Sequence, residues 1–316
     1  MYARSAMRHL ALIVGALVVL SGCATGTPSA WTRGAEAPEG RTEVAAAAVG
    51  GRVVVVGGLT AAGRASARSD LYDVARDRWS RLPDLPIAVH HAMAASDGRR
   101  VYVVGGYATT TALTGASRRV FSLRPGDPRW SELSLLPVSR AAGGAAVVGG
   151  RLYVVGGTFG VKPRLAKRSF VLNLRTRGWI AFAGVPQPRE HLGAAASGDR
   201  IYVLGGRNAA QRFKRADAWD VSERRWIRLP DMPTARGGTS ATARGERLVS
   251  IGGESSSGTD REVEEFDPGA GRWRELPQLP DGRHGLAAAA VGRRLLVLMG
   301  GPRPGLSVSP SVFVLG

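Results

Sequence analysis

One unit recurs six times along this chain, and it constrains the possible folds more than any other feature. In each unit a short apolar run ends at a Gly-Gly pair, and successive pairs lie 47 to 51 residues apart. The pairs begin at Gly57, Gly105, Gly156, Gly205, Gly252 and Gly300. The apolar runs are residues 53–56, 101–104, 152–155, 201–204, 248–251 and 295–299. Runs this short predict buried strands, and a period near 50 residues indicates an array of packed repeats.

A tryptophan followed seven residues later by a proline is a second sixfold marker. The pairs are Trp31 and Pro38, Trp79 and Pro86, Trp130 and Pro137, Trp179 and Pro186, Trp226 and Pro233, and Trp273 and Pro280. Each internal tryptophan is preceded by an aromatic or apolar residue: Tyr72, Phe121, Leu172, Trp219 and Phe266. This order of markers resembles the kelch repeat. The resemblance implies an all-β fold, a β-propeller with four strands in each blade.

The ends of the repeat region predict how the propeller closes. Trp31 stands before any Gly-Gly pair, whereas residues 311–315 read as a third strand with no tryptophan strand after them. We therefore expect a six-bladed kelch-like propeller over residues 31–316, closed by the N-terminal strand of Trp31 joining the C-terminal blade. Closure hides strand edges that an open array would expose to aggregation, and we expect a monomer.

The segment before each Gly-Gly strand is rich in small residues, which predicts the innermost strand of the blade. Side chains crowd near the axis, so alanine and glycine suit that position, while the larger aromatic residues belong farther out between blades. The small-residue segments are 45–48, 92–95, 143–146, 194–196 and 287–290.

The N-terminus has the pattern of an exported lipoprotein. Arg4 and Arg8 precede an apolar run over 10–20, and Leu20-Ser21-Gly22-Cys23 resembles a bacterial lipobox. The resemblance implies a signal peptide over 1–22, an acylated Cys23 and a short tether over 23–30. We expect a lipoprotein on the outer membrane or periplasmic face of a Gram-negative cell, or on the cell surface otherwise. The alternative is an uncleaved N-terminal anchor.

An arginine recurs three residues after the marker proline in five of the six units. These residues are Arg41, Arg140, Arg189, Arg236 and Arg283, and Val89 takes the place in the second unit, followed by His90 and His91. The position begins the innermost strand, so we expect a ring of guanidinium groups at the channel mouth, where they would bind a carboxylate or phosphate. The alternative is that these arginines cap nearby loop carbonyls.

Charged loops between the second and third strands belong to the same face. Two of them are predicted to be basic rims, each with a charge of +4. They contain Lys162, Arg164, Lys167 and Arg168 in the third blade, and Arg207, Arg212, Lys214 and Arg215 in the fourth. The corresponding loop of the fifth blade has a charge of −4. Such charges can steer an acidic partner over about 8 Å, although a solvated rim remains the alternative.

Histidines and glutamates also fall near the predicted mouth. His91 and His191 join the arginines as candidate ligand-binding residues, with Glu43, Glu190 and His284 nearby. Imidazole, carboxylate and arginine together could perform acid/base chemistry on a sugar acid. This resembles the exported bacterial kelch-type sialate mutarotases, but the match is at the level of repeats and assigns no catalytic residue.

Other classes of chemistry lack support in the sequence. Copper radical oxidases also use kelch propellers, but they need a tyrosine–cysteine crosslink, and Cys23 is the sole cysteine. There is no recognised metal-ligand spacing, dinucleotide fingerprint or phosphate loop, so we expect no metal and no cofactor. The net charge of +18 alone does not indicate a nucleic-acid binder, and we expect none.

We therefore predict a binding module rather than an enzyme: a membrane-anchored propeller that binds a protein or an anionic glycan. The alternative is a sugar-acid mutarotase or epimerase that uses the channel mouth.

Overall fold

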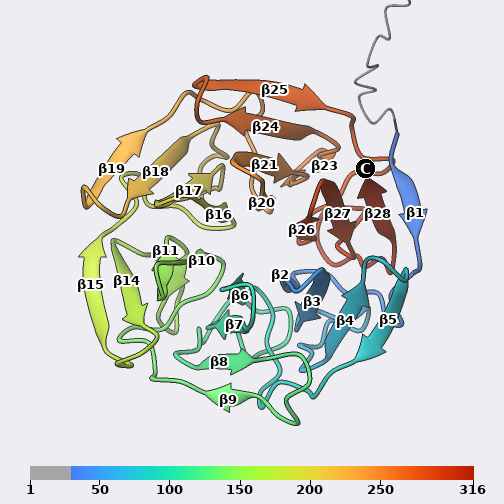
Figure 1. Ribbon diagram of the computed structural model, residues 1–316, viewed down its shortest axis with the longest axis horizontal. Coiled ribbons are helices and arrows are strands. Elements are labelled where there is room, and N and C mark those ends of the chain that lie inside the picture. Colours follow the sequence, from blue (N-terminus) through green and yellow to red (C-terminus); the bar gives the residue numbers. More distant parts are fainter. Residues whose placement is uncertain (1–29) are drawn as a thin grey trace, which may run out of the picture.

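Figure 1 shows the computed structural model as a ring of six four-stranded antiparallel sheets, the blades, around a central channel. The structure describes residues 30–316, so the predicted signal peptide and Cys23 lie outside the described residues. Within that part, no helix has the length and apolar character that crossing a membrane requires. The predicted six-bladed, all-β propeller is confirmed.

Each blade runs from an inner to an outer strand. Blade 1 has β2 (Ala45–Val49), β3 (Arg52–Val56), β4 (Ser69–Asp73) and β5 (Arg78–Arg81). Blade 2 has β6 (Met93–Ser96), β7 (Val101–Val104), β8 (Val120–Leu123) and β9 (Ser131–Glu132). Blade 3 has β10 (Gly144–Val148), β11 (Arg151–Val155), β14 (Arg168–Asn173) and β15 (Trp179–Ala183). A hairpin of β12 (Thr158–Phe159) and β13 (Arg164–Leu165) stands between its two middle strands.

The second half of the ring repeats this order. Blade 4 has β16 (Gly193–Ser197), β17 (Arg200–Leu204), β18 (Ala216–Asp220) and β19 (Arg225–Arg228). Blade 5 has β20 (Ser240–Arg244), β21 (Arg247–Ile251), β24 (Val263–Asp267) and β25 (Arg272–Leu276), with a hairpin of β22 (Glu254–Ser255) and β23 (Gly258–Thr259). Blade 6 has β26 (Ala287–Val291), β27 (Arg294–Leu298), β28 (Val312–Leu315) and β1 (Thr32–Gly34).

Blade 6 joins both ends of the ring. β1 pairs with β28 in antiparallel register, Thr32 opposite Val314, so an N-terminal strand completes the C-terminal sheet. The indole of Trp31 donates a hydrogen bond to the carbonyl of Pro277 in blade 5. The other five marker tryptophans make the equivalent bond to the preceding blade. The predicted closure through Trp31 is therefore confirmed, and indole bonds link every blade to its neighbour.

Burial follows the strand order. The predicted small-residue segments form the inner strands, whose residues line the channel. The second strands are the most buried, with Val53 to Val56 of β3 wholly enclosed. Side chains from neighbouring blades mix in the wedges between them, as Leu71 and Val101 do in one core cluster. Five of the six marker tryptophans are only half-buried, and Trp130 is buried.

The sixth Gly-Gly pair is one residue out of register with the other five. In blades 1 to 5 both glycines adopt positive φ, as Gly57 (64°) and Gly58 (95°) do. In blade 6 this conformation belongs to Met299 (60°) and Gly300 (93°), so the structural pair begins at Met299 and not at Gly300 as the sequence suggested. Gly301 is therefore equivalent to Leu59 of blade 1. Each of the two forms an isolated β-bridge, Leu59 with Thr42 and Gly301 with His284.

Candidate functional site

The five recurrent arginines are buried inside their blades. Their exposed fractions are 0 to 2%, and none is among the residues that line the channel. This corrects the expectation that Arg41, Arg140, Arg189, Arg236 and Arg283 present their guanidinium groups at the channel mouth.

These arginines instead hold the glycine turns of their own blades. Four of them donate to the carbonyl of the first glycine of the pair: Arg41 to Gly57 (2.6 Å), Arg140 to Gly156 (3.2 Å), Arg189 to Gly205 (2.6 Å) and Arg236 to Gly252 (3.2 Å). The carbonyl of a left-handed glycine points away from the sheet ladder and would otherwise be buried without a partner. Capping of loop carbonyls, the alternative weighed from the sequence, is what the structure shows.

The side chain of each recurrent arginine contacts one residue of the third strand of its blade, which is either an acid or a phenylalanine. Arg41, Arg189 and Arg236 each pair with a buried acid: Asp70 (2.6 Å), Asp217 (2.9 Å) and Glu264 (2.6 Å). Arg140 and Arg283 instead lie over the rings of Phe170 and Phe313.

Blade 2 replaces the ion pair with an apolar one. Val89 stands where the other blades have arginine, and Phe121 stands where blade 1 has Asp70; both belong to one core cluster. The arginine–acid ion pair and the Val89–Phe121 apolar pair can occupy the same position in a blade, because a buried ion pair and a packed apolar pair often give similar stability.

The two predicted basic rims differ from each other. In blade 3, Lys162, Arg164, Lys167 and Arg168 are all exposed, and none forms an ion pair with another residue of 30–316. In blade 4, Arg207 binds Glu190 and Glu254, and Arg212 binds Asp260. Arg215 pairs with Asp217, which leaves Lys214 as the exposed member of that rim.

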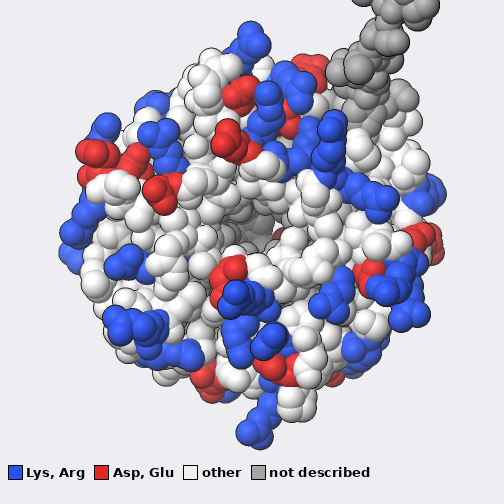
Figure 2. Space-filling view, in the orientation of Figure 1, with Lys and Arg blue, Asp and Glu red and all other residues white. Residues whose placement is uncertain are grey.

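The predicted polarity of the face is therefore reduced where blades 4 and 5 meet. The +4 and −4 loops are neighbours, and the ion pairs Arg207–Glu254 and Arg212–Asp260 between them neutralise two charges on each. Figure 2 shows Lys and Arg spread around the rim of the face in view, with fewer acids between them and a hollow at the centre.

Six residues at one end of the channel form a closed ring, called the mouth ring here. They are Glu43, His91, Ala142, His191, Gly238 and Gly285, one from each blade, each with φ between 50° and 70°. Backbone hydrogen bonds of 2.7 to 3.3 Å run from each blade to the next, with Val44 donating to Gly285 at the closing step. Glycine is the ordinary residue for this conformation, so four non-glycine residues here carry backbone strain.

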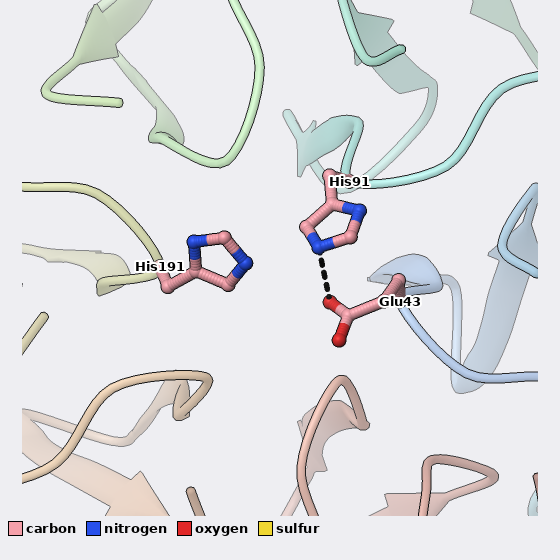
Figure 3. Close-up of side chains that lie close together, drawn as sticks. All are labelled: Glu43, His91 and His191. Carbon is pink, nitrogen blue, oxygen red and sulfur yellow. Dashed lines mark ion pairs between the residues drawn. The ribbon is translucent and has the colours of Figure 1, made fainter. Parts of the chain in front are cut away.

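Three side chains of the mouth ring converge over the channel. Figure 3 shows Glu43, His91 and His191 directed toward one another from three different blades. His91 Nε2 lies 3.1 Å from Glu43 Oε2, and the two imidazole rings meet edge to face with centroids 4.7 Å apart. The ring member between the two histidines is Ala142, whose small side chain leaves room for this contact. One potential ligand atom from each residue lies within 4.8 Å of the other two.

A second layer of polar residues holds these three in place. Glu190 Oε2 lies 2.6 Å from Nδ1 of His191, and Arg207 donates to the other oxygen of Glu190 at 3.1 Å. Nδ1 of His91 lies 2.6 Å from Nδ1 of His90.

His284, from blade 6 beside Glu43, completes this layer. Its Nδ1 lies 3.1 Å from Glu43 Oε1 and 3.5 Å from Glu254 Oε2. The site thus combines four imidazoles with the carboxylates of Glu43, Glu190 and Glu254.

Burial and charge set the protonation of this cluster. Burial lowers the pKa of His91 to about 3 and that of His90 to about 4, so both are neutral near pH 7. Burial opposes ionisation of Glu43, but His91, the hydrogen bond of His284 and the other histidines hold its pKa well below the ordinary value. Burial likewise opposes a charge on His284, yet Glu43 and Glu254 raise its pKa. His284 is therefore better suited than His90 or His91 to carry a proton.

Sequence reasoning found part of this site and missed its chemistry. It placed His91 and His191 near the mouth, and the structure brings them together with Glu43. It did not detect a possible metal-ligand set, because the three residues come from separate blades, 48 and 100 residues apart. The detectable signal was the residue five positions after each marker proline, two after the recurrent arginine, when the six repeats are aligned and this position is compared.

Comparisons with known proteins agree with the repeats. Residues 142–309, more than half of the chain, match the KLHDC2/KLHL20/DRC7 Kelch-repeats domain, and residues 40–86 match the Kelch motif. Kelch-like protein 34 of Homo sapiens is 35% identical over 132 residues, 41% of this chain and 20% of that protein. Kelch-like protein terF of Aspergillus terreus is 31% identical over 165 residues, 49% of this chain and 35% of that protein.

A viral relative matches in the same way. Kelch repeat protein M-T8 of Myxoma virus is 32% identical over 127 residues, 40% of this chain and 24% of that protein. The matched regions span between a fifth and about a third of the length of these relatives. Two sixfold sequence markers, six closed blades and a family match over more than half of its length show that this chain belongs to the kelch-repeat family.

Proposed function

We propose that this propeller is a lipid-anchored binding module that takes an acidic segment of a protein partner on the blade 3 hairpin, β12–β13. Kelch propellers are typically protein-interaction modules, which supports the class of function. The observation that carries the choice of surface is the set of four basic residues on or beside this hairpin, Lys162, Arg164, Lys167 and Arg168. They are exposed and have no ion-pair partner in 30–316.

Apolar surface beside these charges supports a polypeptide partner. Val161 at the hairpin tip is 78% exposed, the largest value among the exposed large hydrophobic residues of the described chain. A cavity of about 390 Å³ lies against the hairpin, lined by Phe159, Leu165 and Phe170 among others. The guanidinium of Arg164 lies over the Phe159 ring at 4.7 Å. A peptide with acidic and apolar side chains would use both features, since interface cores bury apolar anchors inside a polar rim.

The glycan and enzyme alternatives have weaker support. An anionic glycan would use the charges but leave the exposed Val161 without a role. A sugar-acid mutarotase would need a free arginine for the substrate carboxylate, and the five recurrent arginines are engaged inside the blades. Faster anomer exchange of sialic acid in an NMR exchange measurement would support that enzyme over a binding module.

Binding of poly-L-glutamate tests the proposed surface. We expect reversal of Lys162, Arg164 and Lys167 to glutamate to weaken binding roughly ten- to a hundredfold at low salt, because each exposed charge contributes up to about 1 kcal/mol. The effect should fade at high salt. The matched control reverses Arg99, Arg129 and Arg175, three exposed arginines in turns on the opposite face.

Two outcomes decide against the proposal. Equal weakening by both triple variants would show that overall charge drives binding and that the hairpin is not the site. Stronger binding of chondroitin sulfate than of poly-L-glutamate, lost in the hairpin variant, would favour the anionic glycan.

The lipid anchor is a separate part of the proposal. It rests on the lipobox-like Leu20-Ser21-Gly22-Cys23 and on the spacing that follows. A tether of seven residues, 24–30, spans at most about 25 Å, so the propeller would stay close to the bilayer. Cys23→Ser should release the protein from membranes in a carbonate wash, since acyl chains contribute about 0.8 kcal/mol per buried CH₂. A serine variant that still pellets completely would refute acylation as the anchor.

A further inference from the structure

We propose that Glu43, His91 and His191 bind one divalent transition-metal ion of the zinc and ferrous class at the mouth of the central channel. The set consists of two imidazoles and one carboxylate, a donor combination that proteins use for Zn²⁺ and Fe²⁺. The site is independent of the blade 3 hairpin, so the two proposals stand or fall separately.

The distances are close to those of a bound ion. Two donors that each lie about 2.1 Å from a metal can be at most about 4.2 Å apart. The potential ligand atoms here lie within 4.8 Å of one another, whereas donors about 2.1 Å from a tetrahedral ion are about 3.4 Å apart, so the widest pair needs to close by up to about 1.4 Å. We expect rotations of the Glu43 carboxylate and of the imidazoles about their side-chain torsions to supply this movement.

The second layer leaves the required atoms free. Glu190 occupies Nδ1 of His191, so Nε2 is the nitrogen left to coordinate, and it makes no hydrogen bond within the described chain. His90 occupies Nδ1 of His91 in the same way, and His284 holds one oxygen of Glu43. Metal-binding histidines almost always have their other ring nitrogen held by such a partner.

The backbone of the mouth ring gives an independent reason to assign these side chains a function. Glu43, His91 and His191 adopt φ of 54°, 53° and 50°, while blades 5 and 6 have Gly238 and Gly285 at the same place. A glycine would relieve the strain in each blade, and strained non-glycine residues cluster at ligand sites. Gly285 also makes room for Glu43: a Cβ at position 285 would lie 2.6 Å from its Oε1.

The surroundings favour an ion with an open coordination position. The channel cavity of about 120 Å³ includes all three residues in its lining and has room for water beside an ion. Three protein donors leave at least one position for that water or for a small anion. The described chain contains no cysteine, so soft ions that prefer thiolate are disfavoured.

Cobalt and zinc titrations test the assignment. The full chain, purified without a histidine tag and treated with EDTA, should bind one equivalent of Co²⁺ with visible d–d absorption that Zn²⁺ displaces. His91→Gly, His191→Gly and Glu43→Gly should each weaken Co²⁺ binding by at least about a hundredfold. These variants should remain folded, because glycine is the residue that blades 5 and 6 already have at this place.

Two further variants separate positioning from coordination. His284→Gln should weaken Co²⁺ binding about ten- to a hundredfold, as expected for a residue that positions a ligand, and should leave the d–d band shape unchanged. Glu132→Gln alters an exposed glutamate in the outer strand of blade 2 and should leave the affinity at the wild-type value.

The proposal is overturned by either of two results. One is a wild-type chain that is folded by circular dichroism and binds no Co²⁺ or Zn²⁺ up to about 100 µM. The other is unchanged affinity in the folded His191→Gly variant, which would place the ion elsewhere.

Discussion

Replacing Arg236 by valine is expected to destabilise the propeller by about 3–5 kcal/mol, because it leaves a buried charge without a partner. Arg236 pairs with Glu264 at 2.6 Å and donates to the carbonyls of Gly252 and Glu262. Glu264 is 1% exposed and has no other ion-pair partner in residues 30–316. The valine variant therefore removes both the turn-capping bonds and the compensating charge.

A second substitution should restore most of the loss. Blade 2 already has Val89 and Phe121 at these two places. The double variant Arg236→Val with Glu264→Phe should thus lie within about 1 kcal/mol of the wild type, since a packed apolar pair can replace a buried ion pair. Several polar atoms of the native pair, among them Arg236 Nε and Glu264 Oε1, have no hydrogen-bond partner within the described chain, which limits what the pair contributes.

The pH dependence of the single variant gives a further check. Burial raises the pKa of Glu264 even with Arg236 present, so the isolated carboxyl should take up a proton more readily than in the unfolded chain. A carboxyl whose pKa is higher in the folded state than in the unfolded chain stabilises the folded state at a pH below the unfolded-state pKa. That stabilisation is lost as the pH rises through the folded-state pKa. The loss in Arg236→Val should therefore be smaller at pH 5 than at pH 8.

Urea denaturation of the four proteins in a double-mutant cycle measures these terms. Arg140→Val is the matched control, because its blade has Phe170 in place of an acid, and its loss should stay near 1–3 kcal/mol. The reasoning is refuted if Arg236→Val is as stable as the wild type at pH 8, or if the double variant is less stable than the single one.

Three other perturbations test the ring and its mouth. Deleting residues 30–39 removes Trp31 and β1 and should lower stability by about 3–5 kcal/mol in chemical denaturation; an unchanged midpoint would remove Trp31 from the ring. Gly285→Ala should destabilise by about 1–3 kcal/mol more than Gly292→Ala, because both have φ near 55° but only position 285 crowds Glu43; equal melting temperatures would contradict this. Thermal stability should fall as the pH drops from about 6.5 toward 4. Burial holds the pKa of His90 at about 4 and that of His91 at about 3 in the folded protein, so these histidines take up protons at higher pH in the unfolded chain than in the folded one. The double variant His90→Gln with His91→Gly should flatten that pH profile.

The sequence was sufficient for the architecture because the architecture is repeated. Each marker occurs six times, so a chance resemblance in one unit does not change the assignment of the fold. Trp31 identifies the closing strand because it stands before the first Gly-Gly pair. The error at the sixth pair arose within one unit: Met299-Gly300-Gly301 offers two adjacent glycines, and the pattern alone does not show that methionine takes the first place.

The candidate site was less predictable because repeats place backbones and not side chains. The recurrent arginines were expected to begin the inner strands, but each lies four residues before its strand starts, as Arg41 does before Ala45. Whether so long a side chain points to the axis or back into its blade depends on the acid or aromatic residue opposite. Asp70 and Phe121 fill that place in blades 1 and 2, and nothing in their local pattern separates them from other strand residues. The charges of the blade 4 and blade 5 loops likewise cancel in part, through two ion pairs that form only because the loops are neighbours in space.

The joint in blade 6 also determines when the ring can be completed during synthesis. Thr32 pairs with Val314, and the Trp31 indole reaches a carbonyl 246 residues farther along the chain. β1, the first strand of the described residues, therefore pairs with β28, the last one, and its loop-closure entropy is among the largest in this part of the chain. Blades 1 to 5 can form before β28 has been made, whereas the pairing of β1 with β28 is a later step. That step is the natural candidate for the slow phase in refolding, and its rate should depend on β1 far more than on any interior strand.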